Sequence, residues 1–216
     1  MLRILSINSG FLPIIFFLLF YKRNKEKKLW VIFLYALISL ATDYSYNLIN
    51  RKDEFYIFSF FTITEFTLYS LFLYYNFNTN LFKKLLVYSY ILFFPVTVYN
   101  FFQKKFEHFD SLTASIECIL IIFFSVLYLY EQIREPESVF IYTSKKFWII
   151  SGFFLYLSST LFLFLYADKL PDIEQRYYWS INYVFNVVKN IFFSIAFLLR
   201  KDPFSNQPFM RNRVYQ

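Results

Sequence analysis

The sequence predicts an all-α integral membrane protein, one domain over residues 1–216 that forms a bundle of seven transmembrane helices and ends in a short basic tail over residues 200–216. Three observations lead to this prediction: the composition, the length of the apolar segments, and the alternation of basic residues between them. Hydrophobic residues make up 58% of the chain and charged residues 17%, against roughly 45–50% and about 25% in a soluble domain. This excess is too large for a single soluble core, so a bilayer must supply the second apolar environment.

Seven apolar segments have the roughly 17–25 residues that a helix needs to cross about 30 Å of hydrocarbon. They cover residues 4–21, 30–50, 56–76, 82–102, 111–131, 147–167 and 177–199. Polar residues and Pro13 dilute the first segment, so a signal peptide is its alternative interpretation. The segment runs directly into the basic sequence YKRNKEKK instead of a small-residue cleavage site. We therefore expect it to be retained as a first span.

The distribution of basic residues predicts the orientation of the bundle. One set of connections and the tail contain fourteen of them: Lys22, Arg23, Lys25, Lys27, Lys28, Lys83, Lys84, Arg134, Lys145, Lys146, Arg200, Lys201, Arg211 and Arg213. The opposite side contains seven: Arg3, Arg51, Lys52, Lys104, Lys105, Lys169 and Arg176. By the positive-inside rule, the N-terminus is outside and the C-terminus is in the cytoplasm, as expected for a protein of the bacterial plasma membrane. The residues Trp30, Trp148 and Trp179 fall near predicted span ends, where an indole ring prefers to lie.

Several classes of site are excluded by residues that the chain lacks. A single cysteine, Cys118, excludes an intramolecular disulfide, and a single histidine, His108, leaves no set of Cys and His ligands for a metal. The sequence contains neither an HExxH motif nor a Gly-rich phosphate loop. We therefore expect no metal, no cofactor and no catalytic residue. The net charge of +7 reports orientation in the membrane and not nucleic-acid binding.

Four ionisable residues lie inside the predicted spans: Asp43, Glu65, Glu117 and Lys189. Inserting such a residue into a membrane costs about 2.5–3.5 kcal/mol, so each is a candidate functional residue. Polar stripes of helical period contain them, and such stripes face other helices or water rather than lipid. The stripes are Asp43, Asn47 and Asn50; Ser59, Thr62, Glu65 or Phe66, and Tyr69; and Asn182, Asn186, Lys189 and Asn190.

The depth of these residues predicts where a pocket would lie. A rise of about 1.5 Å per residue places Glu65 and Lys189 near the middle of the membrane and Asp43 and Glu117 nearer its outer surface. The inner halves of the third and seventh spans, LYSLFLYY and IFFSIAFLL, are almost purely apolar. We therefore expect a polar pocket that opens outward, with Glu65 and Lys189 as an ion pair. Three carboxyl groups then face one ammonium group, so either one or two carboxyls are protonated, or a cation or amine completes the site.

Two segments carry a resemblance to a known group of proteins. FWIISGFFLYLSSTLFLFLY and YYWSINYVFNVVKNIFFSIAFLL, together with the glutamate of EFTLYSLF, resemble small seven-span bacterial membrane proteins that are found beside, or fused to, sensor histidine kinases. The resemblance covers about the last third of the chain. It implies a membrane input or signalling module, but it supplies no ligand and no catalytic residue. Because this sequence contains no kinase domain, the resemblance implies that a separate protein would carry the signal.

The sequence therefore leads to a sensor-like module whose ligand-binding residues are Glu65, Glu117, Lys189, Asn182, Asn186 and Asp43. Its expected partners are the lipid bilayer and a separate cytoplasmic signalling protein such as a histidine kinase, reached through Lys145, Lys146, Arg200 and Lys201. Three alternatives stay open. The same charged residues could form a pathway for protons, cations or small solutes; Glu65 and Glu117 could act as an acid and base pair in a membrane lipid hydrolase; or the polar residues could be purely structural, with no ligand.

Overall fold

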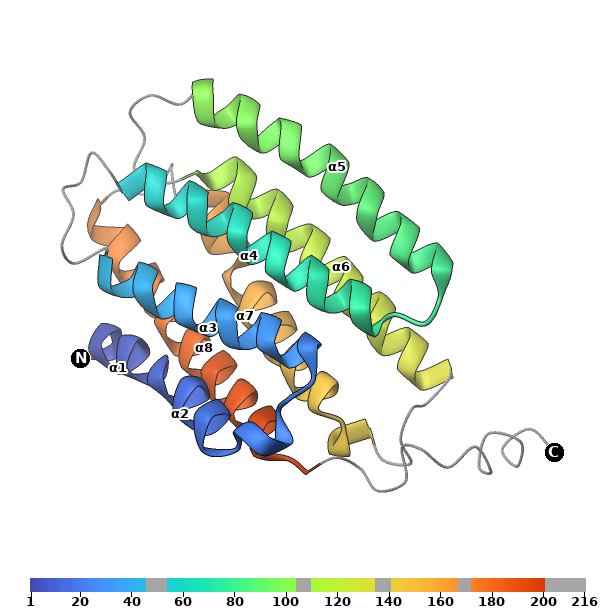
Figure 1. Cartoon of the computed structure of the whole chain (residues 1–216). Helices are drawn as coiled ribbons and strands as arrows, with labels where there is room; N and C mark the ends of the chain where they lie inside the picture. Colours follow the sequence, from blue (N-terminus) through green and yellow to red (C-terminus); the bar gives the residue numbers. More distant parts are fainter. Residues whose placement is uncertain (46–53, 104–109, 135–140, 167–171, 201–216) are drawn as a thin grey trace.

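The computed structural model describes residues 1–45, 54–103, 110–134, 141–166 and 172–200, and within these ranges the elements are all helices (Figure 1). The long helices are α3 (Lys27–Ser45), α4 (Glu54–Asn76), α5 (Asn80–Gln103), α6 (Ser111–Arg134), α7 (Lys145–Tyr166) and α8 (Asp172–Leu198). Two shorter helices, α1 (Leu2–Ser9) and α2 (Phe11–Leu19), precede them. Single 3-10 turns, η1 (Tyr21–Arg23) and η3 (Ile141–Thr143), lie before α3 and α7.

The prediction of seven apolar helical segments is confirmed within the described residues, since seven are long and apolar enough to cross a membrane. The first of them, Leu2–Leu19, corrects the expectation of one helix over 4–21, because it consists of α1 and α2 joined at Gly10. Pro13 has no N–H group to donate to the carbonyl of Ser9, so the regular helical pattern is interrupted there. The N–H of Gly10 instead bonds to the carbonyl of Ile7 at 3.1 Å, which closes a tighter turn.

The helices pack as a bundle in which α8 joins the first two helices to the rest. This helix lies against α7 on one side and against α1 and α2 on the other. Helix α6 lies between α7 and α4, and α3 packs on α4. Helix α5 packs mainly on α4 and α6, and Figure 1 shows it at the edge of the bundle.

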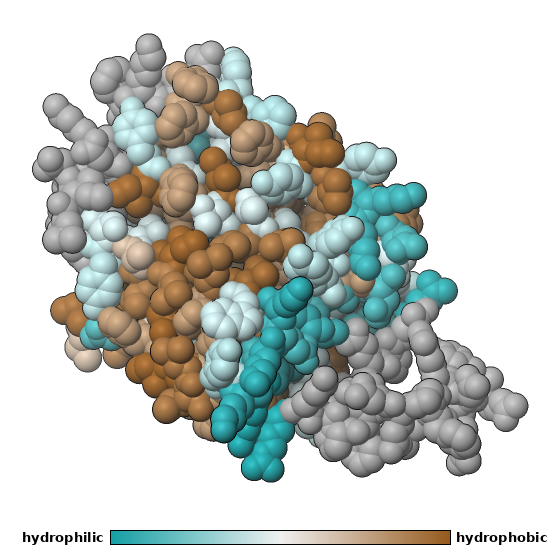
Figure 2. Space-filling view, viewed as in Figure 1, coloured by the Kyte–Doolittle hydropathy of each residue, from teal (hydrophilic) through white to brown (hydrophobic). Residues whose placement is uncertain are grey.

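Two of the basic connections that the sequence places on one side, those before α3 and before α7, meet the end of α8 at one end of the bundle. The ammonium group of Lys145 donates hydrogen bonds to the carbonyl of Arg23 at 2.9 Å and to the side-chain oxygen of Asn24 at 2.6 Å. The amide of Asn24 in turn donates to the carbonyl of Phe197 at 3.1 Å. The turn before α3, the start of α7 and the end of α8 are thereby joined. Figure 2 shows hydrophilic residues gathered at this end, which we call the basic end, beside sides of the bundle that are mainly hydrophobic.

The half of the bundle nearest the basic end has an aromatic core. The ring of Phe153 lies 4.1 Å from that of Tyr69 and 5.1 Å from that of Phe193, measured between centroids. All three side chains are fully buried. The hydroxyl of Tyr69 is satisfied by that of Ser125 at 2.8 Å. This packing closes the middle of the bundle toward its basic end.

Candidate functional site

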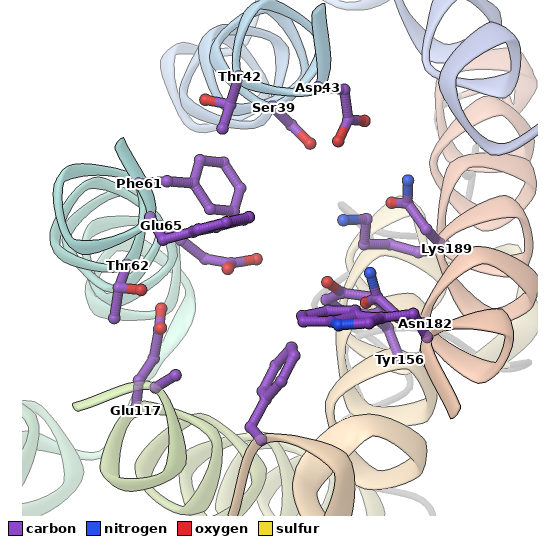
Figure 3. Close-up of a pocket in the computed structure, with 15 residues that line it drawn as sticks. Ser39, Thr42, Asp43, Phe61, Thr62, Glu65, Glu117, Tyr156, Asn182 and Lys189 are labelled. Carbon is purple, nitrogen blue, oxygen red and sulfur yellow. The ribbon is translucent and has the colours of Figure 1, made fainter. Parts of the chain in front are cut away.

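A cavity opens among α3, α4, α6, α7 and α8 in the other half of the bundle, away from the basic end (Figure 3). Its lining runs from Trp179, in the first turns of α8, down to Lys189 and Tyr156 in the middle of their helices. The six residues that the sequence singles out all line this cavity: Asp43, Glu65, Glu117, Asn182, Asn186 and Lys189. Residues from four helices that are up to 146 positions apart therefore meet at one place, as their depth and stripes predict.

Lys189 is fully buried in α8 and is held by two tyrosines. Its ammonium group donates a hydrogen bond to the hydroxyl of Tyr35 at 2.7 Å. It also lies 4.1 Å from the ring centroid of Tyr156 and 5.1 Å from that of Tyr35, distances typical of cation–π contacts. Helix α7 approaches α8 closely on this side because it carries Gly152, where an added Cβ would lie 3.5 Å from the carbonyl oxygen of Lys189. The ammonium group of the lysine thus contacts two aromatic rings and one hydroxyl.

The predicted ion pair between Glu65 and Lys189 is wrong as a direct contact. The hydroxyl of Tyr35 lies between the two side chains, accepting a hydrogen bond from Lys189 and donating one to Glu65 Oε1, also at 2.7 Å. The carboxylate and the ammonium are still balanced, but through a phenol that bonds to both. A buried charge pair is stabilised when further hydrogen bonds satisfy its remaining groups, and Tyr35 supplies them from α3.

Asp43 has its own set of neighbours at the outer part of the cavity. It interacts electrostatically with Lys189 and with Arg3, and its carboxyl group lies near the amide of Asn186. Arg3 belongs to α1, so α1 contributes a positive charge to the same region. Asp43 therefore has a basic partner that Glu65 and Glu117 do not share.

Glu117 differs from the other two acids because it has no such partner. Its side chain is buried, with the residue 3% exposed, and its Oε1 atom has no hydrogen-bond partner among the described residues. The charges that act on it are the repulsive one of Glu65 and the shared one of Lys189. Across the cavity, the side-chain oxygens of Asn182 and Asn186 are also buried without a partner in the described part of the chain. Three residues that line the cavity thus each have a buried acceptor atom that no described residue satisfies.

The asparagine stripe of α8 divides between two roles. The amide of Asn186 donates to the hydroxyl of Ser6 at 2.9 Å, and the amide of Asn190 donates to that of Ser9 at 2.8 Å. These bonds attach α1 to α8. Asn190 therefore has a structural role, whereas Asn186 touches both α1 and the cavity. Asn47 and Asn50, which the sequence predicts to share a stripe with Asp43, lie outside the described residues.

Sequence reasoning missed the aromatic part of the site. Tyr35 and Ser39 precede Asp43 by eight and four positions and so share its helical face, a signal that could have identified both. Tyr156 and Trp179 carried no such signal within their apolar segments. Trp179 lines the cavity and packs on Phe164, with ring centroids 6.0 Å apart, in addition to lying near a helix end. These aromatic rings form a wall beside the acidic groups.

The arrangement limits what the site could hold. Among the described residues, no three His, Cys, Asp or Glu side chains lie close enough together to hold a metal ion. The carboxyl groups are spread over three helices, so an occupant that touches more than one of them needs several atoms.

Comparison with protein-family models, with curated proteins and with solved structures finds no match to this chain. A function for this chain must therefore be inferred from the residues that line the cavity.

Proposed function

We propose that this chain is a multi-pass protein of the bacterial plasma membrane that works as a sensor-like input module. In this proposal the N-terminus is outside, the cavity opens to the outer side, and a small ligand binds there. The observation that carries the proposal is that five helices contribute polar or aromatic side chains to one cavity, in which Glu117 Oε1 has no partner in the described chain. Burying a polar group without a hydrogen-bond partner costs free energy. A ligand that bonds to such a group would offset this cost, so the unpaired group supports a ligand-binding cavity.

Binding is favoured over transport by the core that lies beyond the cavity. A transport pathway needs polar groups that continue to the other side of the membrane. Toward the basic end, the cavity is followed by the packed rings of Tyr69, Phe153 and Phe193. The hydroxyls of Tyr69 and Ser125 bond to each other, and Ser125 also donates to the carbonyl of Ile121. This supports a cavity with one entrance.

Binding is also favoured over the other two readings. A hydrolase with two glutamates needs both carboxyls available as acid and base, but Glu65 accepts a hydrogen bond from Tyr35 that also fixes Lys189. A purely structural role accounts for Asn190, which attaches α1. It does not account for Glu117 or Asn182, whose buried oxygens bond to nothing in the described chain.

Helix α8 offers a route by which a ligand could be sensed at the basic end. The same helix carries Asn182 and Lys189 in the cavity and Phe197 at the basic end, where its carbonyl is held by Asn24. A ligand that shifts α8 would change this contact and, through Asn24, the position of Lys145. We propose that the basic residues Lys145, Lys146 and Arg200, with Lys201 beyond the described residues, face the cytoplasm. There they would contact anionic lipid or a separate signalling protein such as a histidine kinase.

The proposal is tested by access to the cavity from outside the cell. In a Cys118→Ala background, Asn182→Cys should react with a membrane-impermeant cationic methanethiosulfonate reagent added to intact cells. Ala196→Cys, on the same helix but fully buried in the aromatic half, should stay unreactive. If the Asn182→Cys protein folds but does not react, the cavity is not accessible from outside and the proposal is wrong.

A second measurement tests whether occupation is transmitted. The reagent leaves a bulky trimethylammonium group covalently attached inside the cavity. Hydrogen exchange of residues 21–28 and 193–200 should then differ between the modified and unmodified Asn182→Cys protein. Unchanged exchange at the basic end would leave a binding cavity without a sensory role.

A further inference from the structure

Three carboxyl groups and one ammonium group line the cavity, and the neighbours of each acid show which carboxyl lacks a basic partner of its own. Asp43 faces Arg3 as well as Lys189. Glu65 is linked to Lys189 through Tyr35. Glu117 faces only the shared ammonium of Lys189 and the carboxyl of Glu65. Among the three acids that line the cavity, Glu117 is therefore the one beside which a positive charge would displace no contact between described residues.

The other walls of the cavity indicate the size and nature of a cation. The absence of a three-ligand metal cluster in the described residues argues against a divalent ion, which needs several oxygens around one point. The aromatic side chains Phe58, Phe61, Phe164 and Trp179 line the same cavity. Aromatic faces attract organic cations and pack against their carbon atoms. Carboxylate and aromatic surfaces together are the combination that recognises an organic ammonium group.

We propose that the ligand of this cavity is a small organic amine with a single positive charge, whose ammonium group binds Glu117 and whose apolar part packs on the aromatic wall. This inference rests on the proposed function, because it names the ligand class of the same cavity. The ammonium group donates a hydrogen bond to the carboxylate of Glu117, and the side-chain amide of Asn182, which also lines the cavity, offers a second acceptor. Lys189 keeps its bond to Tyr35 and remains the counter-charge of Glu65.

Trp179 provides a direct readout of binding. The chain has three tryptophans, and Trp30 and Trp148 lie at the starts of α3 and α7, at the basic end. A Trp30→Phe, Trp148→Phe protein in detergent or nanodiscs therefore reports on the cavity through Trp179. Benzylamine should change this fluorescence in a saturable way, and benzyl alcohol, which has the same shape without the charge, should bind about tenfold more weakly or worse.

The role of Glu117 is tested by variants in the same background. Glu117→Gln keeps the volume and removes the charge, so the affinity for benzylamine should fall about ten- to hundredfold while that for benzyl alcohol is unchanged. Glu117→Asp should retain part of the selectivity for the amine. Glu26→Gln is the matched control, because Glu26 pairs with Lys28 near the basic end and should leave binding as it is.

Each result supports or overturns the inference. Equal affinity for the amine and the alcohol, or an unaltered affinity in a folded Glu117→Gln protein, would overturn it. If sodium or magnesium chloride changed the Trp179 fluorescence in a saturable way and also displaced benzylamine, the site would bind an inorganic cation instead. Because benzylamine and benzyl alcohol are compared on the unaltered cavity, a variant that fails to fold does not block the test. If Asn182→Cys reacts from outside but benzylamine does not bind, the proposed ligand class is wrong and the outward-facing cavity stands. If a folded Asn182→Cys protein does not react, the proposed function itself is wrong.

Discussion

The ammonium group of Lys189 donates a hydrogen bond to the phenol oxygen of Tyr35, and the two atoms lie 2.7 Å apart in a fully buried setting. The same phenol donates its proton to Glu65 at the same distance. The hydroxyl of Tyr35 thus bonds both to Lys189 on α8 and to Glu65 on α4. The stability of these buried charges depends on a residue that carries no charge of its own.

Removing the hydroxyl of Tyr35 tests this dependence. Tyr35→Phe keeps the ring but leaves Lys189 and Glu65 without their shared partner, which should lower the free energy of unfolding by about 1–3 kcal/mol. Thermal unfolding of the purified protein measures the change. Tyr88→Phe, at a side chain 62% exposed on α5, is the matched control and should have no effect. Equal stability of both variants would contradict the bridging role.

Lys189 and Glu65 should be energetically coupled although they do not touch. Lys189→Met leaves the buried carboxyl groups without their ammonium and should destabilise the fold by about 3–5 kcal/mol. Adding Glu65→Gln removes the charge that the ammonium balances, so the double variant should recover a large part of this loss. A double-mutant cycle on thermal unfolding measures the coupling, and additive effects would show that the two residues act independently.

Glu131 should stabilise the start of α5 from a neighbouring helix. Its carboxylate accepts hydrogen bonds from the backbone N–H of Thr79 at 2.6 Å and of Asn78 at 3.1 Å, just before α5 begins. Glu131→Gln removes the negative charge from this helix N-terminus and should cost about 1–2 kcal/mol. Hydrogen exchange should become faster over the first turns of α5. An effect spread evenly over all helices would argue against local capping.

Gly152 and Gly10 should differ in their tolerance of an added methyl group. At Gly152, a Cβ would lie 3.0 Å from the Cβ of Phe192 on the facing helix. Gly152→Ala should therefore push α7 away from α8 and cost about 1–3 kcal/mol. At Gly10, the nearest atom is the end of the flexible Leu40 side chain, which can move aside. Gly10→Ala is expected to be milder in a thermal unfolding assay, and the reverse order would refute the close approach of α7 and α8 as the cause.

The structure also separates residues that sequence patterns group together. Asn182, Asn186, Lys189 and Asn190 follow one helical stripe, yet Asn190 bonds to Ser9 on α1 while Lys189 bonds to Tyr35 on α3. A stripe spans about a quarter to a third of a helix surface, which is wide enough to touch two different neighbours. Which neighbour each residue meets depends on how the helix is rotated, and a single helix does not specify that.

The sequence by itself determined the seven apolar helical segments and the burial of Glu65, Glu117 and Lys189, because segment length, apolar content and helical period are local properties of the chain. Only the tertiary structure decided that Tyr35 lies between Lys189 and Glu65, that α1 is held by α8, and that Glu117 Oε1 has no hydrogen-bond partner in the described chain. These features join positions as far apart as Ser6 and Asn186. They depend on which helices pack together and at what rotation, and that is set by the whole bundle at once.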